Sequence, residues 1–185
     1  MARRRELALL ERISNLLRAE TRAAAQARGL QPVHVDILDY VDQCNRWSDT
    51  PAGVTGYLGL TKGTVSQSIM RLEERGLLVR EADPEDGRVW HLRLTGEGRR
   101  VLRAIRESPF EALLDEEELE GGDLGDRLEA LLAALQRANG GRSFGVCRTC
   151  RYFETPSASS ARCGLLGVPL TKSDSTKICR EHEAA

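Results

Sequence analysis

The sequence has no long apolar run, which limits the classes of protein to which it can belong. No stretch of its 185 residues approaches the roughly 18 unbroken apolar residues of a transmembrane helix. The basic start is interrupted by Glu6, Glu11 and Arg12, so it lacks the apolar core of a signal peptide. We therefore expect a cytoplasmic protein with no membrane partner, whose cysteines lie in a reducing compartment.

Sequence signatures of catalysis are also lacking. The chain contains no nucleophile elbow, phosphate-binding loop or dinucleotide fingerprint, and its glycines do not form a phosphate cradle. A content of 41% hydrophobic and 30% charged residues is typical of a folded globular protein. We therefore expect a globular protein that is not an enzyme.

The net charge of −1 conceals an uneven distribution of charged residues. Residues 62–106 contain ten basic and seven acidic residues, whereas residues 107–126 contain nine acidic residues and no basic one. Because the distribution of charge matters more than its sum, near-neutrality does not exclude nucleic-acid binding.

Apolar spacing and capping residues predict mainly helices, and a change of period after Gly76 predicts a β-hairpin. Thr61 is the expected N-cap of the helix that Gly76 ends. The order helix, short helix, helix, hairpin is that of a winged helix-turn-helix. The expected helices cover 3–28, 32–47, 51–58, 62–75, a segment after Thr95 and a segment around 128–135, and the expected strands cover 77–80 and 89–94.

The helix over 62–75 divides into an apolar face and a polar face. Val65, Ile69 and Leu72 recur at the spacing of a core-facing stripe. The polar groups on the other face are those that hydrogen-bond base edges and phosphates in a major groove. An ordinary solvated helix would show a similar polar stripe. The residues of the predicted polar stripe are Thr64, Gln67, Ser68 and Arg71.

Two further positions complete the predicted DNA-binding surface. Lys62 and the free N–H groups of the first helical turn suit a phosphate. Arg88, at the hairpin tip, is placed to reach the neighbouring minor groove, and Asp86 is placed to orient its guanidinium through a charge-assisted pair.

Several stretches of the chain together carry a family resemblance: LTKGTVSQSI from residue 60, RLEERGLL from residue 71, DPEDGR from residue 83 and LTGEG from residue 94. With these motifs, residues 33–106 resemble the multiple-antibiotic-resistance regulator (MarR) family. The resemblance implies a homodimer built from the first and last helices. It also implies that residues 62–71 lie in the groove of a pseudo-palindromic double-stranded operator, with the two recognition helices about 34 Å apart. Arg88 would be the wing arginine and Asp86 its partner.

The chain departs from the family in its third helix and in its tail. Residues 51–58 read PAGVTGYL where the family usually has a polar residue followed by Leu-Ala, so a different packing of this helix is expected. The broad apolar stripe of the first helix suits either its own domain or a dimer contact. We expect an N-terminal dimerisation helix over 1–30, a winged helix-turn-helix over 31–107, C-terminal dimerisation helices over 108–139 and a small metal-stapled module over 140–185.

The tail contains four of the five cysteines, in the pattern C-x2-C-x12-C-x15-C. Four thiols in so short a cytosolic segment indicate a metal centre rather than disulfides. Metal–thiolate bonds would also supply stability that such a small core lacks. The expected ligands are Cys147, Cys150, Cys163 and Cys179.

The stretches CRTCRYF, ARCGLLGVPL and ICREHE resemble small four-cysteine modules that bind a [4Fe-4S] cluster. Tyr152, Phe153 and the aliphatic residues 165, 166 and 168 would shield such a cluster. The alternative is a structural Zn²⁺ with these residues as a small core. His182 is expected on the surface, and Cys44 in or near the core.

These observations predict a homodimeric DNA-binding transcriptional regulator whose cluster senses redox or iron state. The tail is expected to pack on the dimerisation helices and to alter the spacing of the recognition helices. One alternative is a regulator with a structural zinc site and a small-molecule effector. Another is a winged-helix module for protein interaction or electron transfer.

Overall fold

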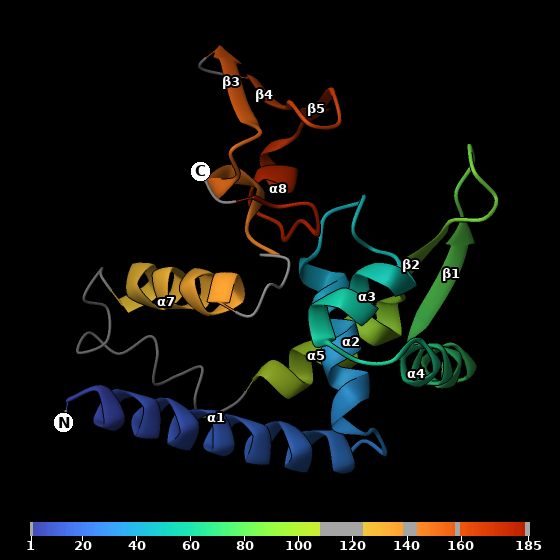
Figure 1. Ribbon diagram of the computed structural model, residues 1–185. Helices are drawn as coiled ribbons and strands as arrows, with labels where there is room; N and C mark the ends of the chain where they lie inside the picture. The colour runs from blue at the N-terminus through green and yellow to red at the C-terminus, as the bar shows by residue number, and fades with distance from the viewer. Residues whose placement is uncertain (1, 108–123, 139–143, 158–159, 184–185) are drawn as a thin grey trace.

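A computed structural model describes residues 2–107, 124–138, 144–157 and 160–183 of the chain. Figure 1 shows a long N-terminal helix along one side, a helical bundle with a projecting hairpin, and a C-terminal module standing over that bundle. The elements are α1 (Ala2–Gln26), α2 (Pro32–Gln43), α3 (Pro51–Leu58), α4 (Lys62–Glu74), β1 (Leu78–Ala82), β2 (Trp90–Leu94), α5 (Gly96–Arg106), α7 (Leu124–Ala138), η1 (Cys147–Thr149), β3 (Phe153–Ser157), β4 (Ser160–Cys163), β5 (Val168–Leu170) and α8 (Lys172–Ser175).

The predicted starts of α3, α4 and α5 are confirmed, because threonine caps fix them locally. The hydroxyl of Thr50 accepts a hydrogen bond from the amide of Gly53 at 3.1 Å, and Thr61 and Thr95 cap α4 and α5 in the same way. Each cap satisfies one of the amides that a helix leaves without a partner in its first turn. Gly76 ends α4 with a left-handed φ of 66°, which a glycine adopts without steric cost.

The core of the bundle lies between α2, α4 and the hairpin. Val65, Ile69 and Leu72 of α4 are all buried, as their spacing predicted. They pack with Leu38 of α2 and Leu92 of β2 in one apolar cluster. Burial of each large apolar side chain contributes about 1.5–3 kcal/mol, so this cluster fixes α4 against the rest of the domain.

The predicted hairpin is confirmed as an antiparallel pair. β1 and β2 run in register from Leu78 opposite Leu94 to Ala82 opposite Trp90. Its inner end is buried through Leu78 and Leu92, whereas the tip projects away from the bundle (Figure 1). The hairpin is therefore a wing whose base is fixed by the core.

The C-terminal module is a three-stranded antiparallel sheet in the order β3-β4-β5, with η1 before it and the short α8 after it. Thr171 and Asp174 form a capping box that starts α8. The sequence analysis did not predict these strands. They are short and mostly exposed, so the alternating apolar pattern that marks a half-buried strand is absent.

α2 ends at Gln43, and the prediction that it continues to near Trp47 was wrong. Residue Ile178 of the tail pairs with Cys44 in a short β-bridge, its amide donating to the Gln43 carbonyl at 3.0 Å. The Asn45 amide donates to the Ile178 carbonyl at 2.9 Å. A partner more than 130 residues away in the sequence therefore decides where this helix stops.

α1 and α7 both present apolar side chains to solvent. The exposed residues are Leu7, Leu9, Ile13, Leu16 and Leu17 on α1, and Leu124, Leu128, Leu131, Leu132 and Leu135 on α7. None of the described helices combines the length and the apolar composition needed to cross a membrane. The acidic segment over residues 107–126 falls mainly on residues 108–123, outside the described part of the chain.

Gly53 is a position where a side chain cannot be added without moving the backbone. A methyl group there would collide with the Ser48 carbonyl oxygen, which accepts a hydrogen bond from the Tyr40 hydroxyl at 2.8 Å. We expect Gly53→Ala to lower the free energy of unfolding by about 1–3 kcal/mol in urea titrations.

A matched control for this prediction lies on α4. At Gly63 the nearest atom to an added methyl is 4.0 Å away, so Gly63→Ala should leave stability unchanged or raise it by about 1 kcal/mol. Equal stability of the Gly53→Ala variant and the wild type would show that the contact between α3 and the preceding turn is looser than the structure indicates.

Candidate nucleic-acid interface and cysteine module

α4 presents a polar face to solvent. Thr64, Gln67 and Arg71 are exposed on it, as predicted, and Lys62 is exposed at the first residue of the helix. The Thr64 hydroxyl lies 2.9 Å from that of the cap residue Thr61. A cation and first-turn amides at one end suit a phosphate, and amide and guanidinium donors along the side suit base edges.

Ser68 is the exception, and its placement on the exposed stripe was wrong. Its residue surface is only 6% exposed. Position 68 lies three residues after Val65 and four before Leu72, so helical geometry turns it to the edge of the core-facing stripe. Its small side chain fits there, and it does not contribute to the exposed face.

Two exposed positions on α4 were missed by the sequence analysis. Ser66 and Met70 both face solvent. They follow Lys62 at steps of four residues, the spacing that places side chains on one face of a helix. That spacing was the signal that could have identified them.

The wing tip holds Arg88 in a defined orientation, as predicted. The Asp86 carboxylate accepts from Nε of Arg88 at 2.9 Å and from Nη2 at 3.0 Å, a two-pronged pair. This hydrogen bonding lowers the pKa of the Asp86 carboxyl, so the pair stays ionised at neutral pH. The Arg88 side chain is nevertheless 90% exposed, which leaves its guanidinium available to an external partner.

A buried carboxylate joins the wing to the turn before α3. Asp49, 2% exposed, lies 2.5 Å from Nδ1 of His91 and pairs with Arg93, both on β2. The other ring nitrogen of His91 lies 2.9 Å from Asp83 in the wing turn, and this hydrogen bond lowers the pKa of the Asp83 carboxyl. His91 therefore has a structural role.

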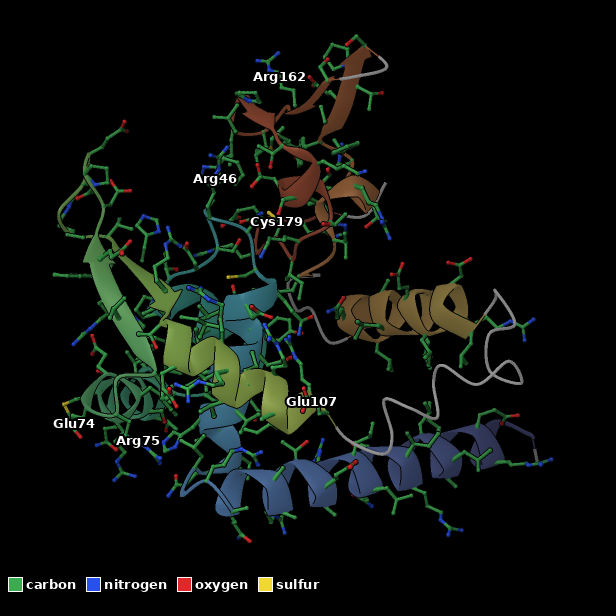
Figure 2. The ribbon with its side chains drawn as sticks, turned by 180° about the vertical axis from the view of Figure 1, so that it is seen from behind. Arg46, Glu74, Arg75, Glu107, Arg162 and Cys179 are labelled. Carbon is green, nitrogen blue, oxygen red and sulfur yellow. The ribbon has the colours of Figure 1, made fainter. Side chains whose placement is uncertain are left out.

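The end of α4 is also tied to the end of α1. Arg75, labelled in Figure 2, donates from its two terminal nitrogens to the carbonyls of Gly29 at 2.6 Å and Arg28 at 2.9 Å. Arg28 in turn donates to the Ala104 carbonyl of α5 at 3.0 Å. α1 is thus held to α4 by side chains whose partners lie 46 and more residues away.

Comparison with known proteins identifies this domain. The model of the MarR family matches residues 28–89. Residues 28–89 are similar to the MarR family. That family consists of transcriptional regulators, so the resemblance stated from the sequence motifs is confirmed. A comparison with curated protein sequences finds no match.

Solved structures share the fold of the MarR-family domain. CouR from Rhodococcus jostii RHA1, bound to p-coumaroyl-CoA, is 24% identical, with 69% of this chain and 88% of that chain covered and a TM-score of 0.55. A mutant of MepR from a multidrug-resistant S. aureus clinical isolate is 21% identical, with 71% and 97% covered and a TM-score of 0.58. The MarR-family regulator SP03579 is 20% identical, with 76% and 96% covered and a TM-score of 0.54.

The four tail cysteines line one small cavity of about 20 Å³ in the C-terminal module. Cys147 and Cys150 flank η1, Cys163 ends β4, and Cys179 comes from the last segment of the chain. Four of the predicted shielding residues surround the same cavity: Tyr152, Phe153, Leu165 and Leu166. The donor set and its apolar surroundings therefore fit a thiolate-ligated centre.

The thiols do not form a finished ligand set as they stand. Among the residues that the structure describes, no three or more His, Cys, Asp or Glu side chains form a group that could hold a metal ion. The metal centre therefore remains a prediction. Its support is the convergence of four thiols, from three separate segments, on one cavity.

His182 is buried, and its expected surface position was wrong. It is 8% exposed, its Nε2 lies 3.0 Å from the Thr149 hydroxyl, and its ring packs on the backbone of Gly145. A methyl group at Gly145 would lie 2.5 Å from the His182 ring, so this glycine allows the close approach. His182 is therefore packed inside the module, a position that a local sequence pattern does not reveal.

Cys44, the residue that follows α2, is a buried thiol, as predicted. Burial raises its pKa to about 12, from an unfolded value of 9.0. A raised pKa stabilises the folded state fully below pH 9, and this contribution falls as the pH rises toward 12. We expect Cys44 to contribute to a loss of stability that reaches about 2 kcal/mol at pH 10.5, measured by urea unfolding.

The control for this prediction is the pH slope of a variant that lacks the thiol. Cys44→Ala lowers stability at every pH because it leaves a small cavity, but its decline between pH 8 and pH 10.5 should be shallower than that of the wild type. Identical slopes would show that Cys44 ionises as easily in the folded protein as in the unfolded chain.

Proposed function

We propose that the chain is a homodimeric, sequence-specific DNA-binding transcriptional regulator. The observation that carries this proposal is the pairing of an exposed polar face on α4 with a fixed, exposed Arg88 in the wing of a MarR-family domain. The core packs α4 against the base of the wing, and Asp49 fixes the wing to the turn before α3. Such a surface can place a helix in the major groove while the wing reaches the adjacent minor groove.

The dimer is supported by the apolar faces of α1 and α7. Ten large apolar residues on these two helices are exposed in the single chain. Contiguous apolar surface of this kind marks an interaction site, and a second copy of the chain supplies a matching surface. Two copies would present two α4 helices to successive turns of a pseudo-palindromic operator.

The cysteine module is proposed to hold a [4Fe-4S] cluster through Cys147, Cys150, Cys163 and Cys179. The cluster supplies a charged centre that oxygen, nitric oxide or iron shortage can oxidise or remove. Tyr152 and the aliphatic side chains around the cavity would exclude solvent from it. This chemistry would make the protein a sensor of redox or iron state.

A structural zinc site with a small-molecule effector is the second candidate. The present cavity volume of about 20 Å³ suits a body of about the size of one water, closer to a single ion than to a cluster. A separate cleft of about 310 Å³ between the module and β2 could take an effector. Its charged lining residues are Asp42, Arg46, Asp49, Arg93, Arg99, Asp174 and Lys177.

Anaerobic purification of the full chain tests both proposals for the module. A brown protein with about four irons and four sulfides per chain supports the cluster, whereas a colourless protein with one zinc per chain supports the alternative.

Titration of labelled duplex from upstream of the gene, at several salt concentrations, tests DNA binding. Affinity no higher than for unrelated duplex would contradict sequence-specific binding.

A further inference from the structure

We infer that the cysteine module controls the DNA-binding helices through a direct contact with α3 and the turn before it. This inference rests on the proposed function and adds the route of regulation. The module contact consists of Phe144, Lys177, Ile178 and Arg180 from the tail, packed on residues 42–57. The sequence analysis placed the packing of the tail on the dimerisation helices; the described contacts lie on the end of α2, the turn after it and α3.

The first part of the module contact is aromatic. Phe144 is 9% exposed and meets the Tyr57 ring of α3 edge-on, at 5.5 Å between centroids. Tyr57 in turn packs on Tyr40 of α2 at 4.7 Å. Phe144 has a φ of 41°, which a bulky residue adopts only when its surroundings hold it there. The packing of Phe144 on α3 is therefore specific.

The sequence of α3 is matched to this aromatic contact. A methyl group at Gly56 would lie 3.0 Å from Cζ of Phe144, closer than an ordinary van der Waals contact. Gly56 thus leaves room for the phenyl ring. This explains part of the departure of residues 51–58 from the family pattern, because the chain also has a tail that ordinary members lack.

The second part of the module contact caps the end of α2. The Lys177 ammonium donates to the Asp42 carbonyl at 2.7 Å, and the Ile178 amide donates to the Gln43 carbonyl at 3.0 Å. These two carbonyls belong to the last turn of α2, where carbonyl groups have no hydrogen-bond donor within the helix. The Arg180 amide donates to the Ser48 hydroxyl at 3.0 Å, which extends the contact along the turn.

Both parts of the contact are joined to the cysteine cavity within a few residues. Cys179 follows Ile178, and its amide donates to the carbonyl of Gly145, the residue after Phe144, at 3.0 Å. The Cys147 amide donates to the Lys177 carbonyl at 3.1 Å. Figure 2 shows Cys179 where the module meets the bundle. A metal bound by these thiolates would hold Cys147 and Cys179 in place. Its loss would free these two cysteines, and with them the neighbouring residues Phe144 and Ile178.

The other side of the contact leads directly to the DNA-binding surface. Ser48 precedes Asp49, whose carbonyl accepts from the Leu92 amide of the wing at 2.7 Å. Thr50 then caps α3, which packs against α4. A shift of the turn that contains Ser48 therefore moves both the wing and the support of α4.

Hydrogen exchange on the full chain, loaded with its metal and stripped anaerobically by a chelator, tests this route without DNA. We expect the amides of Asn45, Ile178, Arg180 and α3 to exchange at least tenfold faster after stripping, with residues 5–20 of α1 unchanged. Faster exchange in α1 with residues 45–58 unchanged would overturn the inference. So would a preparation that binds neither iron nor zinc.

A pair of variants tests the same route by DNA affinity. Phe144→Ala should keep its metal content but lose the difference in DNA affinity between loaded and stripped protein, whereas Phe144→Leu, which keeps apolar volume, should retain most of it. A full response to metal in Phe144→Ala would overturn the inference. If Phe144→Ala loses its metal, the exchange measurement on the wild type decides. Absence of DNA binding contradicts only the proposed function, because the exchange result does not depend on DNA.

Discussion

Replacement of Arg88 by alanine is expected to weaken binding to specific duplex DNA about 10- to 100-fold, with the fold intact. The Arg88 guanidinium is exposed at the wing tip and held by both oxygens of Asp86, so little side-chain freedom is lost when it enters a groove. Fluorescence anisotropy with labelled duplex at several salt concentrations measures the loss. The salt dependence should fall by about one ion.

Two further variants separate geometry from charge in this prediction. Asp86→Ala keeps the Arg88 charge but frees its orientation, so we expect a smaller loss of affinity, about 3- to 10-fold. Arg162→Ala removes another exposed arginine, from β4 and far from the wing, and should bind DNA as the wild type does (Figure 2). Equal losses in Arg88→Ala and Arg162→Ala would show that only net charge matters and that the wing does not contact DNA.

The winged helix was predictable because its boundaries are set by residues close in sequence. Thr50, Thr61 and Thr95 each cap the helix that follows them, and Gly76 ends α4 through its own backbone conformation. The Asp86–Arg88 pair is equally local. Signals of this kind act within three or four residues, so the structure that they determine does not depend on how the rest of the chain folds.

The features that were missed depend on partners far away in the sequence. α2 stops at Gln43 because Ile178 pairs beside it, and Gly56 makes room for Phe144. From the sequence alone, the glycine-rich α3 was seen only as a departure from the family pattern. Part of its physical reason is an aromatic ring from the tail, and no helical periodicity contains that information.

The cysteine module shows the same division between spacing and packing. The C-x2-C spacing predicts that Cys147 and Cys150 lie close together, because a single turn joins them. That Cys163 and Cys179 line the same cavity depends on the fold of the three-stranded sheet and on the pairing of Ile178 with the end of α2. The spacing could indicate a metal centre, but it could not indicate the helix to which the cysteine module is attached.

Introduction of negative charge into the apolar surfaces of α1 and α7 is expected to separate the dimer. Ile13→Glu together with Leu132→Glu places four carboxylates per dimer in surfaces that would otherwise be buried, at a cost of several kcal/mol. Light scattering should then give a mass of 20.5 kDa, that of one chain, at micromolar concentration. A single copy reaches only one half of a pseudo-palindromic site, so operator affinity should fall at least about 100-fold.

The matched control for this prediction is Asn15→Glu, which adds the same charge to α1 at a polar position away from Ile13 and Leu16. It should leave both the mass and the DNA affinity unchanged. A double variant that remains dimeric would place the subunit contact on other surfaces. A dimer gains affinity because its two α4 helices bind two linked half-sites. A monomer with wild-type affinity would therefore show that one winged domain binds its site alone.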